Sequence, residues 1–107
     1  MSRDTNLTIK SGRLTADPQL RYSPEGKAIC EFSIACNSSD TKVNFFNCVA
    51  WEKGAEIINE YMKKGSKILV TGRDEQNRWD DDQGKKQVRS TIQVQSFEFM
   101  GGKRDEE

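Results

Sequence analysis

The chain has no histidine and only three cysteines among its 107 residues. The lack of histidine excludes His-based catalytic triads and most transition-metal sites. Cys30, Cys36 and Cys48 cannot all pair within one chain, and none belongs to a CxxC motif, so neither a disulfide framework nor a zinc site is indicated. We therefore expect three reduced, mostly buried thiols, with no metal and no cofactor.

An excess of charge is also lacking, because 17 Lys and Arg residues balance 17 Asp and Glu residues. Any surface that binds nucleic acid must therefore be a local cluster of cations. No apolar run approaches the length of a bilayer span and no signal peptide is recognisable, which predicts a cytoplasmic protein without membrane contact. The chain also lacks a phosphate-binding glycine loop and a nucleophile beside a base, so we expect no enzyme.

The length suits one compact domain. Apolar and polar residues alternate along residues 7–14 and 28–36, and residues 43–51 are rich in aromatics, so three strands are predicted. Proline and glycine within residues 23–26 suit a type I turn between the first two strands.

Helical spacing of apolar residues follows along residues 53–64. Residues 67–72 and 88–100 predict two further strands, joined by a polar hairpin arm around Trp79, and the alternation slips near Ser96, which suggests a β-bulge. Three strands, a helix and two strands form the order of an all-β fold with one helix, a five-stranded OB-fold barrel whose helix lies between strands 3 and 4. We expect this domain to cover residues 1–100 and residues 101–107 to form a short, flexible, charged tail.

Short motifs follow one another in a specific order and spacing: Gly12-Arg13-Leu14 with Asp17-Pro18, Arg21-Tyr22-Ser23-Pro24-x-Gly26, Phe32-Ser33-Ile34-Ala35, Tyr61-x-Lys63-Lys64-Gly65-Ser66, Arg78-Trp79 and Met100-Gly101-Gly102. Over about residues 6–102 the chain resembles the bacterial-type single-stranded-DNA-binding protein (SSB) family. The resemblance implies an OB fold and sequence-tolerant binding of single-stranded DNA during replication, recombination or repair. It also implies a homo-oligomer, usually a homotetramer, that is associated with the nucleoid.

By matching position, the resemblance implies that Phe45, Trp51 and Trp79 stack on bases. Stacking suits such binding because every base has a π-face. Core packing is the competing interpretation for Trp51, and either Phe45 or its neighbour Phe46 is expected to belong to the barrel core or a subunit interface. The expected phosphate contacts are the cations Arg3, Arg13, Arg21, Lys42, Lys53, Lys64, Arg73 and Arg78.

The sequence also departs from the family pattern. Asp74, Glu75 and residues 80–82 make the Trp79 arm acidic where the family tends to be basic. The sequence ends at residue 107 without the long tail, acidic and ending in Pro-Phe, that recruits replication and repair proteins in cellular members. Either such a tail has been removed or this member lacks the recruiting role. These departures leave an alternative open: a tailless OB-fold adaptor of the primosomal replication protein B type that works mainly through protein contacts.

Overall fold

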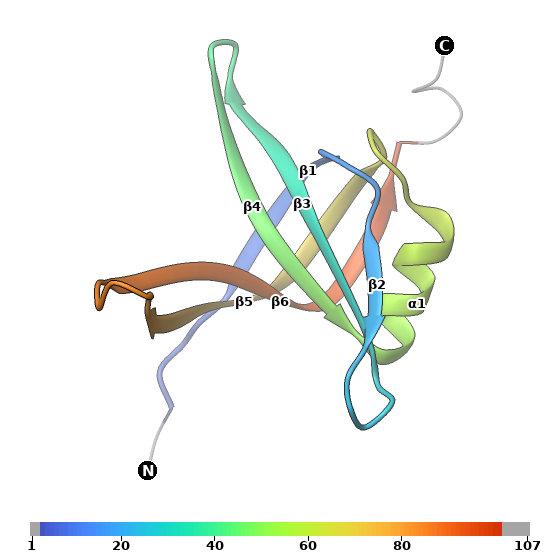
Figure 1. Cartoon of the computed structure of the whole chain (residues 1–107). Helices are drawn as coiled ribbons and strands as arrows, with labels where there is room; N and C mark the ends of the chain where they lie inside the picture. Colours follow the sequence, from blue (N-terminus) through green and yellow to red (C-terminus); the bar gives the residue numbers. More distant parts are fainter. Residues whose placement is uncertain (1–2, 102–107) are drawn as a thin grey trace.

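The structure is a computed structural model that describes residues 3–101, and it is built mainly of strands (Figure 1). One helix accompanies the strands, and no helix within residues 3–101 is long and apolar enough to cross a bilayer. The elements in chain order are β1 (Thr8–Leu14), β2 (Gln19–Tyr22), β3 (Ala28–Ser39), β4 (Lys42–Trp51), α1 (Glu52–Tyr61), β5 (Lys67–Asp80) and β6 (Lys86–Met100).

Five of the strands close into a barrel. The sheet runs in the order β1-β5-β6-β4-β3, and pairing of β1 with β3 completes the ring. All pairs are antiparallel except β4 with β6. The predicted five-stranded OB-type barrel is therefore confirmed, with one detail corrected. The helix follows β4 rather than a third strand, because the four-residue β2 pairs with β3 as a separate strand outside the ring.

Alternation along the strands places the core inside this barrel. Cys30, Phe32 and Ile34 of β3 point inward and are buried, as the sequence predicts. Ala55 and Ile58 of α1 join the same core, so the helix covers one end of the barrel. Burial of each large apolar side chain contributes about 1.5–3 kcal/mol.

The helix is shorter than the predicted residues 53–64, because it ends at Tyr61. Lys63 and Ser66 form a local turn: Ser66 N–H donates to the Lys63 carbonyl at 2.9 Å, and Ser66 Oγ accepts the Lys63 N–H at 3.1 Å. A serine hydroxyl that bonds nearby backbone in this way competes with helical hydrogen bonding. The φ of +90° at Gly65 belongs to this turn.

The predicted β-bulge in the last strand is confirmed. Thr71 pairs with Ser96 while Gly72 pairs with Val94, so Gln95 of β6 has no opposite residue on β5. The extra residue shifts the alternation and brings Phe97 inward, where it packs against the core.

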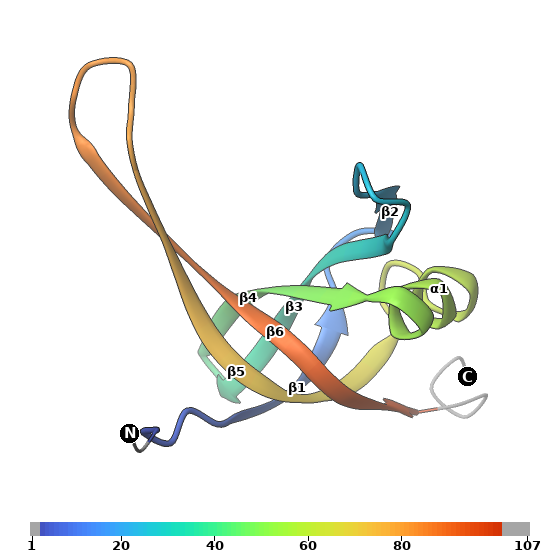
Figure 2. The same cartoon turned by 90° about the horizontal axis from the view of Figure 1, so that it is seen from below.

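Two hairpins project from the barrel: β3–β4, and a longer ribbon that we call the arm, formed by residues 73–93 of β5 and β6 (Figures 1 and 2). At its root, the Asn6 side chain donates to the Asp74 carbonyl at 2.8 Å and accepts the Asp74 N–H at 3.1 Å. At its tip, Asp81 Oδ1 accepts the N–H groups of Gln83 and Lys85, each at 2.9 Å. Of the tail predicted for residues 101–107, all but exposed Gly101 lies outside the described residues.

Candidate functional site

The register of the strands puts the three predicted stacking residues on one side of the sheet. Phe45 and Trp51 share the outward side of β4, because Trp51 lies six positions after Phe45 and side chains an even number of positions apart point to the same side of a strand. Val49, on the same side, pairs with Gln93 of β6, which in turn pairs with Arg73 of β5. Trp79 lies six positions after Arg73 on β5, so its side chain points to the same side of the sheet as that of Arg73. We call this common side the outward face.

All three aromatic side chains are exposed to solvent. Exposure is 64% for Phe45, 44% for Trp51 and 48% for Trp79. Phe46 instead packs against the core from the other side of β4. Trp51 is therefore not a core residue, and Phe46 is the member of the phenylalanine pair that belongs to the barrel.

A groove of about 880 Å³ crosses the outward face between β2 and β3 on one side and the arm on the other. Trp51 lies in its wall, and Gln95 reaches it from the bulge. Phe45 and Trp79 are not among the lining residues, although they share the outward face. The side chains used below that line the groove are Asp17, Arg21, Glu31, Trp51, Arg73, Glu75, Asn77, Arg89, Thr91 and Gln93.

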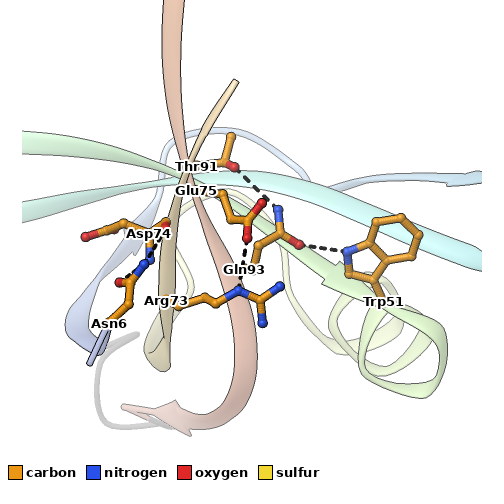
Figure 3. A network of polar contacts seen from close by, with 7 residues as sticks. All are labelled: Asn6, Trp51, Arg73, Asp74, Glu75, Thr91 and Gln93. Atoms are coloured by element: carbon orange, nitrogen blue, oxygen red, sulfur yellow. Dashed lines mark hydrogen bonds and ion pairs between the residues drawn. The ribbon is translucent and has the colours of Figure 1, made fainter. Parts of the chain in front are cut away.

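A chain of hydrogen bonds holds Trp51 in place (Figure 3). Its Nε1–H donates to Gln93 Oε1 at 3.0 Å, and Gln93 Nε2 donates to Thr91 Oγ1 at 3.4 Å. The indole thus has its one polar group satisfied at an edge, while its rings remain partly exposed. An oriented, exposed ring is what a stacking platform for a base requires.

Three arginines line the groove. Arg21 and Arg73 were predicted as phosphate contacts, whereas Arg89 was not. Each of the two predicted arginines forms an ion pair inside the groove, Arg21 with Glu31 and Arg73 with Glu75. No signal in the sequence marks Arg89, because only its pairing with Asn77 of β5 shows that it lies on the same side of the arm as Arg73 and Trp79.

The other six predicted phosphate contacts do not line the groove. Arg78 lies on the opposite side of the arm from Trp79 and donates to Gln76 Oε1 at 2.7 Å. Arg13 donates to the Gly65 carbonyl at 2.9 Å. Lys42 lies at the start of β4, on the same hairpin as Phe45. The remaining three, exposed on other parts of the molecule, are Arg3, Lys53 and Lys64.

The thiols do not form the groove surface, because Cys30 and Cys36 are not among its lining residues and the side chain of Cys48, which is, belongs to the barrel core. Burial raises the pKa of Cys48 to about 12, and burial, followed by the negative charge of Glu31, raises that of Cys30 to about 11. Both groups are therefore neutral thiols at physiological pH, and Cys36 is only half-buried. Within residues 3–101, no three His, Cys, Asp or Glu side chains are grouped so that they could hold a metal ion.

Comparison with known proteins agrees with this geometry. Residues 5–100 match the model of the single-strand binding protein family. A single-stranded DNA-binding protein of Fusobacterium nucleatum is 42% identical over 88% of this chain and 66% of its own length. Single-stranded DNA-binding protein A of Bacillus subtilis is 36% identical over 89% of this chain and 59% of its own length.

The chain thus spans roughly three-fifths of the length of the curated relatives that it matches. The match itself covers nearly all of the barrel and both hairpins. On this match and on the closed barrel with its exposed aromatic face, the chain belongs to the single-strand binding protein family.

Proposed function

We propose that this protein binds single-stranded DNA without strong sequence preference, by stacking bases on Phe45, Trp51 and Trp79 and by holding phosphates with cations. The observation that carries the proposal is the presence of three exposed aromatics on one face together with an arginine-lined groove. The names of the curated relatives, which are single-stranded DNA-binding proteins, support the same function. The protein acts by binding and not as an enzyme.

Stacking and phosphate contact have different parts in this proposal. Each stacked base contributes about 1–3 kcal/mol whatever its identity, which gives affinity without sequence readout. Phosphate contacts align the strand and make binding dependent on salt. Arg21, Arg73 and Arg89 are proposed to contact phosphates within the groove, and Lys42, at the start of the strand that carries Phe45, is proposed to contact a phosphate beyond it.

The other cations predicted from the sequence are less well placed to contact a phosphate. Arg78 lies on the side of the arm opposite to Trp79, and Arg13 is engaged with the Gly65 carbonyl. For these two, and for Arg3, Lys53 and Lys64, a phosphate contact requires the strand to leave the groove and pass around the barrel.

We further propose that residues 1–100 act as one binding domain in a cytoplasmic homo-oligomer, of which a tetramer is the expected form. Leu7 and Ile9 support self-association, because both are more than half exposed and Ile9 lies on the outside of β1. Exposed apolar side chains close together mark surfaces that associate. Sedimentation equilibrium tests the oligomeric state, and a monomer at micromolar concentration would contradict it.

The decisive experiment is a titration of intrinsic tryptophan fluorescence with oligo-dT at low salt, repeated as salt is raised. We expect strong quenching that salt reverses. Trp79→Ala, Trp51→Ala and Phe45→Ala should each weaken binding by about five- to hundredfold, which corresponds to the loss of one stacked base. The matched control is Tyr22→Ala, because Tyr22 is 59% exposed but pairs with inward-facing Ala28. Absence of quenching by the wild-type protein at low salt would refute the proposal and favour the adaptor alternative.

A further inference from the structure

The groove on the outward face has as many acidic as basic side chains in its lining. Arg21, Arg73 and Arg89 are its cations, and Asp17, Glu31 and Glu75 are its anions. A surface intended only to attract phosphate would be expected to carry an excess of cations. The equal numbers of acidic and basic side chains in the groove therefore require an explanation.

Two of the three arginines are held by glutamates of the groove. Arg73 Nε lies 3.0 Å from Glu75 Oε2, two residues along β5 (Figure 3). Arg21 Nη2 lies 3.0 Å from Glu31 Oε2, across the pairing of β2 with β3. Both pairs face the solvent space of the groove, since the four side chains are 42% to 57% exposed.

Arg89 differs from the other two. It pairs with Asn77 across the arm, so its opposite residue is an uncharged amide. Among the described residues no carboxylate lies within ion-pair distance of Arg89. The groove thus offers one arginine directly and two through an exchange of partners.

We propose that Glu31 and Glu75 limit the affinity of the groove by competing with DNA phosphates for Arg21 and Arg73. This inference rests on the proposed function of the same groove. An exposed ion pair contributes only about 0–1 kcal/mol, so a phosphate can replace the carboxylate as the partner of the arginine. The displaced carboxylate nevertheless remains two residues away along β5, or on the neighbouring strand, and repels the phosphate that has taken its place.

This competition also reduces the salt dependence of binding. A cation that neutralises a phosphate releases counterions, and each such cation steepens log K against log salt by about 0.7 for single strands. An arginine whose charge is already balanced by a glutamate contributes little to that slope. In this protein Arg89 contributes to the slope fully, whereas Arg21 and Arg73 contribute only in part.

The test measures the dissociation constant of oligo-dT, by tryptophan quenching, from low to high salt for Glu75→Gln and Glu31→Gln. Glutamine keeps an oxygen that accepts the arginine N–H and removes only the charge. We expect binding at low salt to tighten about three- to tenfold for each substitution, and the slope to steepen by up to about 0.7. The matched control is Glu56→Gln, an exposed helix residue outside the groove lining, which changes net charge equally and should leave both values within twofold.

Comparing Arg73→Gln with Arg73→Gln/Glu75→Gln separates competition from a simple change in charge. Competition acts through Arg73, so removing the Glu75 charge in the Arg73→Gln background should leave affinity and slope within about twofold. A simple charge effect would instead tighten binding there as much as it does in the wild type. If the wild type binds oligo-dT but Glu75→Gln and Glu31→Gln leave both affinity and slope unchanged, the competition is refuted and the proposed function stands. If the wild type does not bind oligo-dT at low salt, both the function and the inference are overturned.

Discussion

The substitution Gly72→Ala tests how the root of the arm is built. Gly72 faces the barrel interior beside the bulge, where it pairs with Val94. A Cβ atom at this position would lie 2.9 Å from the carbonyl carbon of Gln93, 3.2 Å from the Cα of Val94 and closer still to the Gln93 oxygen. Real Cβ atoms are essentially never found below 3.0 Å from such neighbours. Because backbone atoms of β6 surround the position, no side-chain rotation relieves the clash.

The expected cost follows from that geometry. Overpacking that forces a backbone to move costs about 1–3 kcal/mol, and this contact lies at the upper end because two strands must separate. A loss of about 3 kcal/mol is a large part of the 5–15 kcal/mol that stabilises a typical domain. It lowers Tm by about 12–24 °C in a domain of this size. The movement also displaces Gln93, so the hydrogen bond to Trp51 should weaken together with the fold.

Urea unfolding followed by circular dichroism, at one fixed protein concentration, measures this loss. Gly54→Ala is the matched control, because its added Cβ would meet only the Phe97 ring, at 3.3 Å from Cε1, and a side chain can move. We expect the control to stay within about 1 kcal/mol of the wild type. A Gly72→Ala variant that is as stable as the control would show that the strands at the bulge are not held as closely as described.

Three further predictions concern single contacts. Asn6→Ala removes both hydrogen bonds to the Asp74 backbone, so we expect a loss of about 1–2 kcal/mol and faster hydrogen exchange at the Asp74 amide; unchanged exchange would contradict it. The pKa of Asp81 lies below its ordinary 3.8, first because the Lys85 N–H donates to it, so the order of the arm tip should persist above that pH and be lost as pH falls through the lowered pKa. NMR of the Gln83 and Lys85 amides during acid titration checks this, and Asp81→Asn should abolish the transition. Aromatic disulfide reagents should label Cys36 rapidly in the native protein and the buried Cys30 and Cys48 only after unfolding, whereas rapid labelling of all three would refute the described burial.

Much of the fold was predictable because the alternation of apolar and polar residues shows which side of a strand is buried. The inward series Cys30, Phe32 and Ile34 reads correctly from the sequence, and the slip near Ser96 reveals the bulge. The end of the helix was not predictable in the same way. The prediction extended the helix to residue 64, and only the hydrogen bonds between Lys63 and Ser66 show that this segment is a turn.

The candidate site was predictable only in part, for a related reason. The positions of Phe45, Trp51 and Trp79 could be inferred from family resemblance, and their shared face then follows from parity. The sequence holds no comparable signal for the cations that contact phosphate. The residues around an exposed arginine in a strand do not show whether its side chain faces the groove or the opposite side. Arg78 and Arg89 illustrate this, since only the register shows that they lie on opposite sides of the arm.

The core and the outward face are two sides of the same strands, but they do not support all three aromatics equally. Trp51 follows buried Val49 and Ala50 on a barrel strand, and Gln93 fixes its indole. Trp79 lies on a two-stranded ribbon beyond the core, and such a ribbon is only marginally stable by itself. Its order depends on Asn6 at the root and Asp81 at the tip. The proposed stacking on Trp51 would therefore use a position fixed by the barrel, whereas the proposed stacking on Trp79 would depend on the arm. The contacts at the root and tip of the arm would then contribute to affinity without touching a base.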